Sequence, residues 1–312
     1  MPFGSLEPAR RLVWVVVAAC CVGAPVTSNA DTTPTPLHAA ARAGDLARVK
    51  ALLDGGTPVD LRAPDTGETV LHAAVDAGHR DVVRHLVARG ADVNARTRHG
   101  ATPLLGALLS DDDELVAVLL DAKADPNGGD PLHVAALTGA SSAARLLLRA
   151  GADVNRMVDD VTPLLLASGQ GHAAVVRVLL DAGSNPRHAS PGMTPLHAVA
   201  RGSSGGMLLM EAALRPYGAS LTPEMKRRLQ EGTGRAEITR LLVAAGADVE
   251  ARTPQRWKPL ITAAWNGRIE VVEALLPVGA DISARDSEGF TRPRRHRPGS
   301  SPARGPGGRG DQ

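Results

Sequence analysis

The stretch Thr69–Ala74, with the sequence TVLHAA, is one copy of a motif that decides how this chain folds. Its clearest counterpart is Thr35–Ala40, TPLHAA, which lies about 33 residues earlier. Altered copies begin at Thr102, Asp130, Thr162, Thr194 and Lys258. Self-similarity with this period is the signature of a solenoid, in which short supersecondary units stack along one axis.

A second block follows the motif within each unit. It reads GADVN at Gly90–Asn94 and at Gly151–Asn155, and GADVE at Gly246–Glu250. Between the blocks lie apolar runs with helical spacing, such as Val82–Val87. Thr then Pro suits the start of a helix, because Thr caps it and Pro has no N–H to satisfy there. Glycine suits its end. Each unit therefore predicts helix, turn, helix and hairpin-like loop.

This pattern closely resembles the ankyrin repeat family over about residues 31–290. The resemblance implies an all-α solenoid of about eight helix pairs, with short hairpin fingers and a concave groove. The residues agree with it, because one unit cannot bury its own apolar stripe and needs neighbours. Small residues such as Ala40 and Ala74 would let the helices approach closely.

The resemblance also assigns a role to a repeated histidine. In this family the histidine of the TPLH motif forms a structural hydrogen bond to the backbone. That role falls here on His38, His72, His133 and His197. It makes these side chains structural rather than metal-binding or catalytic.

The composition excludes several classes of protein. Aromatic residues make up 2% of the chain, which argues against an ordinary globular core. A formal net charge of +2 excludes a generally polybasic nucleic-acid binder. Two cysteines cannot build a disulfide framework. We find no zincin, nucleophile-elbow, P-loop or dinucleotide motif, so we expect no enzymatic activity, no metal and no cofactor.

The first thirty residues read as an export signal. Arg10 and Arg11 precede an apolar run too short to span a bilayer, and Ser28–Ala30 forms a small-x-Ala cleavage site. Cleavage after Ala30 would give a soluble periplasmic or secreted protein. Val17–Cys20 also resembles a bacterial lipobox, so lipidation at Cys20 and an uncleaved anchor are the alternatives. The excess of arginine over lysine indicates GC-rich coding and favours a bacterial source.

The chain departs from the pattern in three places. Asp111 and Lys123 replace the helix-ending glycines of the third unit, at a cost of about 1 kcal/mol each. Residues 198–258 fit a count of eight helix pairs in which the seventh has a degenerate first helix, around 202–234, or one unit carrying an insert of about 30 residues. Residues 291–312 are rich in Arg, Pro and Gly, which predicts a disordered tail, although a frameshifted gene end would look the same.

Binding to a partner protein is the remaining function. Residues that neither cap a helix nor fill the core should project from the fingers and from the first helix of each unit. The candidate partner-binding residues are Asp65, Glu68, Asp76, Arg98, His99, Asp159, Met193, Arg201, Arg256, Trp257 and Trp265. Trp and Arg are enriched at binding hot spots. The two tryptophans lie in the last unit, so capping the end of the stack is the alternative role for them.

We therefore expect a monomeric, non-catalytic scaffold that binds another protein through the groove and finger tips. The alternatives are a lipid-anchored structural protein of the cell envelope and a secreted effector that acts on a host protein. We expect no nucleic-acid partner, and a membrane contact only if Cys20 is lipidated.

Overall fold

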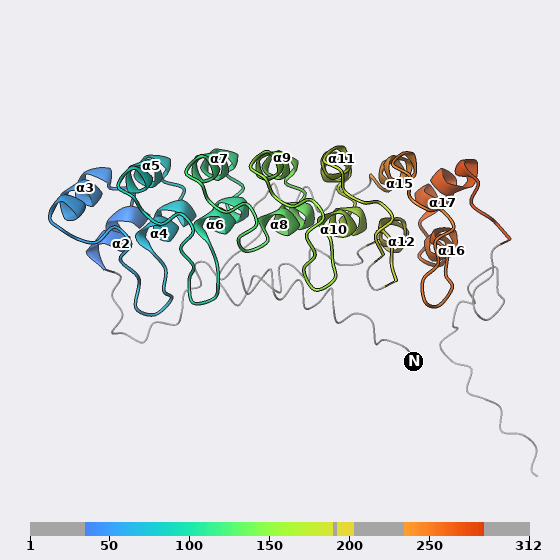
Figure 1. Cartoon of the computed structure of the whole chain (residues 1–312), viewed down its shortest axis with the longest axis horizontal. Coiled ribbons are helices and arrows are strands. Elements are labelled where there is room, and N and C mark those ends of the chain that lie inside the picture. The colour runs from blue at the N-terminus through green and yellow to red at the C-terminus, as the bar shows by residue number, and fades with distance from the viewer. Residues whose placement is uncertain (1–34, 190–191, 203–233, 284–312) are drawn as a thin grey trace, which may run out of the picture.

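The computed structural model describes residues 35–189, 192–202 and 234–283, and within these ranges the helices form two rows (Figure 1). The inner row consists of α2 (Pro36–Arg42), α4 (Val70–Asp76), α6 (Pro103–Leu109), α8 (Pro131–Thr138), α10 (Pro163–Gln170), α12 (Pro195–Arg201) and α16 (Pro259–Trp265). The outer row consists of α3 (Leu46–Asp54), α5 (Arg80–Ala88), α7 (Asp113–Asp121), α9 (Ser141–Arg149), α11 (Ala173–Asp181), α15 (Arg235–Ala244) and α17 (Ile269–Leu275), the last followed by the 3-10 turn η2 (Leu276–Val278).

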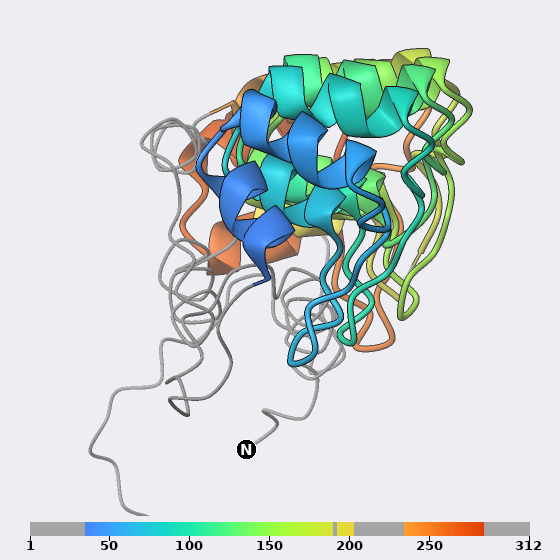
Figure 2. The same ribbon diagram turned by 90° about the vertical axis from the view of Figure 1, so that its left-hand side faces the viewer.

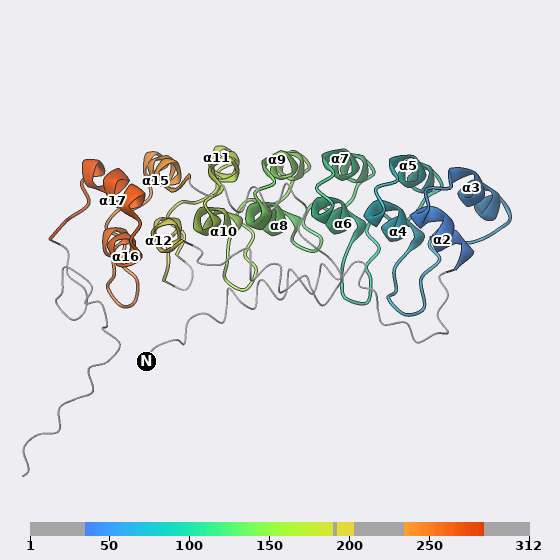
Figure 3. The ribbon, with the colours of Figure 1, turned by 180° about the vertical axis from the view of Figure 1, so that it is seen from behind.

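The described residues thus form an all-α solenoid of seven helix pairs, in line with the approximate count expected from the sequence. The order of the pairs along the stack is the same when the molecule is viewed from behind (Figure 3). The expected leader 1–30 with Cys20, most of the degenerate segment 202–234 and the tail 291–312 lie outside the described residues.

Helix starts and ends follow the local chemistry of the motif. The Thr69 hydroxyl accepts a hydrogen bond from the backbone N–H of His72, which caps α4. Gly90 follows α5 with a φ of 84°, a left-handed conformation that costs glycine little. Asp111 and Lys123 adopt the same conformation without being glycines, with φ of 56° and 69°. The third unit therefore carries backbone strain that the glycine-containing units avoid.

The core lies between the two rows and runs without interruption from the first pair to the last. Leucines and valines of the outer helices, such as Leu86 and Leu147, are fully buried against the inner row. Ala73 and Ala74 of α4 are also fully buried, so the inner helices meet through small side chains. Close packing of small residues explains how the array buries a long core without aromatic rings.

Contacts between helices define the sixth pair of the array. Helix α12 packs against α10 on one side and α16 on the other, and α15 packs against α11, α12 and α17. Among the described residues, the sixth pair is therefore α12 with α15.

The fingers connect the outer helix of one pair to the inner helix of the next and project together from one edge of the stack (Figure 2). Two of them contain an isolated antiparallel bridge, Arg62 with Thr69 and Val158 with Val161. Within the described parts of the chain, no helix combines the length and the apolar character needed to cross a membrane.

Candidate functional site

One position near the end of each inner helix differs in chemistry from repeat to repeat, and it is at least partly exposed in every repeat except the fourth, where Leu137 is buried. It is the seventh residue of each inner helix, and we call these residues the inner-helix ladder. From the first pair to the last they are Arg42, Asp76, Leu109, Leu137, Gly169, Arg201 and Trp265. Because consecutive inner helices pack side by side, this position forms a continuous row across the array. Three of the residues expected to contact a partner, Asp76, Arg201 and Trp265, belong to it.

A second group of candidate residues lies in the fingers. Asp65, His99, Asp159 and Arg256 are exposed, as expected from the sequence. Asp159 and Arg256 stand in left-handed conformations with φ of 47° and 62°. Met193 is only half-buried and lies just before α12. The fingers that carry these residues project together from one edge of the stack (Figure 2).

Arg98 is exposed but also holds two neighbouring fingers together. Its guanidinium donates a hydrogen bond to the carbonyl of Pro64 at 2.7 Å. Its backbone N–H donates to the carbonyl of Thr66 at 2.9 Å. A change at Arg98 would therefore alter finger geometry as well as any contact with a partner.

The two tryptophans of the last repeat contact each other. Their ring centroids are 5.3 Å apart and the rings are tilted by 53°. Trp257 is half-buried at the base of its finger, and its carbonyl accepts a hydrogen bond from Nε2 of His197 at 2.9 Å. Trp265 keeps 48% of its surface exposed. The structure thus joins a finger residue and a ladder residue into one aromatic surface.

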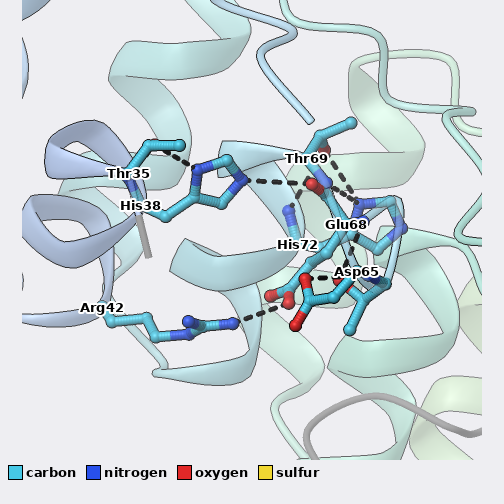
Figure 4. Close-up of polar contacts among 8 residues, drawn as sticks. Thr35, His38, Arg42, Asp65, Glu68, Thr69 and His72 are labelled. Carbon is cyan, nitrogen blue, oxygen red and sulfur yellow. Dashed lines mark hydrogen bonds and ion pairs between the residues drawn. The ribbon is translucent and has the colours of Figure 1, made fainter. Parts of the chain in front are cut away.

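Glu68 does not project, and the expectation that it does is wrong. Its residue is 4% exposed, and one carboxylate oxygen pairs with Arg42 of the preceding repeat at 2.6 Å (Figure 4). The other oxygen, Oε1, is buried without a hydrogen-bond partner. The physical reason is its place beside the cap Thr69, where the Glu68 carbonyl also accepts a hydrogen bond from His38 at 3.1 Å.

Asp76 also projects less than expected. It is partly buried at the end of α4, and burial, followed by the negative charge of Glu68, raises the pKa of its carboxyl to about 8. Arg42 opposes this shift. The sequence held a signal for this cluster, because Arg42 and Asp76 occupy the same position in adjacent inner helices and Glu68 lies between them.

The repeated histidines are structural, as the resemblance implied. Nε2 of His38, His72, His133 and His197 lies 2.9–3.1 Å from a backbone carbonyl of the next repeat. Burial lowers the pKa of His72 to about 4 and lowers the pKa values of His133 and His197 as well. These imidazoles link one repeat to the next through hydrogen bonds to the backbone. Across the described ranges, no cluster of three or more His, Cys, Asp or Glu residues could hold a metal ion.

Lys258 is a stabilising residue that the sequence did not single out. It occupies the position of the capping threonine before α16 and is 5% exposed. Its ammonium group pairs with Glu250 and, at 3.1 Å, with Asp281. Hydrogen bonds from Ser283 and Lys258 lower the pKa of Asp281 to about 2. The last repeat thus replaces a helix cap with an ion-pair network that joins the finger before α16 to the segment after α17.

Comparisons with known proteins agree with this architecture. A family model described as ankyrin repeats in three copies matches residues 11–97, 95–158 and 231–286, and a single ankyrin repeat matches residues 159–190. A search of the curated proteins finds no match.

Two solved structures show the same arrangement. The crystal structure of the human ASB11 ankyrin repeat domain is 29% identical, with a TM-score of 0.59, and the match covers 78% of this chain and 97% of that one. The ankyrin repeat domain of Bcl-3, whose structure is described as that of a unique member of the IkappaB protein family, is 27% identical with a TM-score of 0.58, covering 79% of this chain and all of that one. Ankyrin repeat domains bind other proteins and are generally non-catalytic scaffolds. On the extent of the family match and the repeated helix pairs, this chain belongs to the ankyrin repeat family.

Proposed function

We propose that this chain is a non-catalytic scaffold that binds a partner protein through the inner-helix ladder and the finger tips. The observation that carries the proposal is the Trp257–Trp265 pair, which joins these two surfaces and leaves Trp265 half exposed. Tryptophan in such a place supplies a large contact area and is a common hot-spot residue. A specific interface would bury about 800 Å² on each partner.

The alternative role of the tryptophans, covering the end of the stack, is less well supported. Beyond Trp265 the last repeat keeps other large apolar side chains in contact with solvent. Ile269 is 68% exposed and Ile282 is 75% exposed. The tryptophan pair therefore does not shield the apolar residues that an end cap would be expected to cover.

We expect the variants Trp257→Ala and Trp265→Ala to bind a partner about 10-fold more weakly while changing the thermal midpoint little. The measurement is photo-crosslinking in extracts of the source cells, with p-benzoylphenylalanine at position 256 of the wild-type chain and of each variant. The same reporter at the exposed outer-helix residue Arg240 is the matched control.

A discrete crosslinked species from position 256, absent from position 240 and weakened by either tryptophan change, supports the proposal. Unchanged crosslinking together with a large fall in the thermal midpoint would show that the pair stabilises the end of the array instead. Measurable substrate turnover by the purified chain would contradict the non-catalytic part of the proposal.

We propose in addition that the chain is exported, on the evidence of its first thirty residues alone. Mass spectrometry of the mature N-terminus should find Asp31 if a signal peptide is removed, which makes the scaffold soluble outside the inner membrane. A diacylated Cys20 would instead identify a lipid-anchored envelope protein. Recovery of the chain with Met1 in the cytoplasmic fraction would contradict export.

A further inference from the structure

The carboxylate of Asp76 packs against Gly106 of the next inner helix. A Cβ atom at Gly106, in the middle of α6, would lie 2.7 Å from Oδ1 of Asp76 and 3.4 Å from Val75. Glycine inside a helix costs about 1 kcal/mol relative to alanine. Alanine occupies the same position in α2 and α4. The absence of a side chain at Gly106 therefore makes room for the Asp76 carboxylate on the inner-helix ladder.

A second carboxylate, that of Glu68, lies near Asp76. Glu68 approaches from the finger that precedes α4, and its charge raises the pKa of Asp76. Its side chain is 5% exposed, with Oε2 paired to Arg42 and Oε1 buried without a hydrogen-bond partner (Figure 4). A buried carboxylate oxygen that lacks a donor costs stability unless a donor is supplied.

The cluster is short of one positive charge. The carboxylates of Glu68 and Asp76 lie near one guanidinium, that of Arg42. This guanidinium donates its hydrogen bond to Glu68. Within the described part of the chain, no hydrogen bond or ion pair reaches the Asp76 carboxylate. The burial that keeps this group protonated near neutral pH would be compensated if a cation came within hydrogen-bond distance.

We infer that Asp76, together with Glu68, receives the cationic side chain of an arginine or lysine of the partner protein. This inference rests on the proposed function and names the chemistry of one contact within it. A partner side chain suits the site better than a divalent metal ion, because no group of three or more His, Cys, Asp or Glu residues in the described part of the chain could hold a metal ion. Asp76 is partly exposed, so a side chain can reach it from the surface.

The neighbouring ladder position, Leu109, indicates a second residue of the partner segment. Leu109 follows Asp76 along the row and is partly exposed. Inner helices packed side by side lie about 10 Å apart. An extended peptide advances about 3.3 Å per residue, so a basic residue at Asp76 places the third residue beyond it near Leu109. The segment that fits has a basic residue and an apolar residue three positions apart.

The test uses the full chain and two synthetic octapeptides, acetyl-GGRAALGG-amide and the same peptide with citrulline, the neutral isostere of arginine. Binding is followed by NMR through the backbone amide of Gly106. We expect saturable shifts with the arginine peptide and at least 10-fold weaker binding of the citrulline peptide. The variant Asp76→Asn should remove this difference, while Asp181→Asn, at an exposed carboxylate of the outer helix α11, should preserve it.

Equal binding of the two peptides to the wild-type chain, no binding of either, or an undiminished preference for arginine in Asp76→Asn would each overturn the inference. Asp76→Asn is nearly isosteric and removes a buried titratable group, so we expect it to fold, and its circular dichroism spectrum checks this. The crosslinking experiment at the tryptophan pair reports on the opposite end of the array. It therefore shows separately whether the proposed scaffold function fails.

Discussion

Replacement of His72 by leucine should lower the free energy of unfolding by about 3 kcal/mol, because it leaves buried polar groups without partners. The backbone N–H of Thr69 donates to Nδ1 of His72 at 3.3 Å, and its hydroxyl lies 2.8 Å from the same atom. Nε2 then carries the proton and donates to the carbonyl of Ala101 at 3.1 Å. Leucine fills a similar volume but satisfies none of these groups. Urea unfolding followed by circular dichroism measures the loss.

Two matched variants make this prediction specific. His133→Leu should cost less than His72→Leu, because Nδ1 of His133 has no hydrogen-bond partner. Asp130 stands there in place of the capping threonine, in a left-handed conformation, and its side chain pairs with Arg156. His99→Leu, in an exposed finger, should change stability by less than 0.5 kcal/mol, as ordinary surface changes do (about ±0.5). Equal losses at the three positions would contradict the structural role assigned to the motif.

The second large effect is a change of stability with pH. Asp76 and His72 contribute to it with opposite signs. The pKa of Asp76 is raised from 3.8 to about 8, so the folded chain binds the extra proton between these values. Stability therefore falls as the pH rises through this window, by about 1.4 kcal/mol per pH unit at most. The pKa of His72 is lowered from 6.5 to about 4, so the unfolded chain binds the extra proton there. Stability therefore falls as the pH drops through that second window.

Between pH 4 and 6.5 these two slopes oppose each other, whereas between pH 6.5 and 8 that of Asp76 acts without opposition from His72. We expect the wild-type chain to lose up to about 2 kcal/mol between pH 6.5 and 8. The variant Asp76→Asn should be nearly flat there, and it should lose stability more steeply in acid than the wild type. Urea midpoints measured from pH 4 to 9 for both chains test this. A wild-type stability that rises between pH 6.5 and 8 would contradict it.

The repeat sequence predicted most of the fold because its signals are local. A threonine or proline at a helix start and a glycine such as Gly90 at a helix end act within a few residues, so a short motif specifies each pair. The histidine role transferred through the resemblance for the same reason, since the motif carries its own partners. The pairing of α12 with α15 needed contacts, because these helices are far apart in the sequence.

The candidate binding residues also divide into those set by local sequence and those set by contacts between repeats. Sequence identified Asp65, His99, Asp159 and Arg256 as exposed, because a finger residue that caps nothing has little to pack against. It misplaced Glu68 and did not foresee the burial of Asp76, since both depend on residues of other repeats. Glu68 pairs with Arg42 from the preceding repeat, and Asp76 fits over Gly106 of the following one. Similarly, the contact between Trp257 and Trp265 joins a finger to the end of a helix.

By itself, the amino-acid sequence determined that this chain folds as stacked ankyrin repeats, because each repeat encodes its own caps, turns and apolar stripe. Only the tertiary structure decided which side chains share a surface, which carboxylates are buried together and where α12 finds its outer partner. The reason is that stacking brings side chains from separate repeats to within a few ångströms of one another. Burial, charge pairing and pKa depend on those neighbours, and a one-dimensional pattern does not contain their distances.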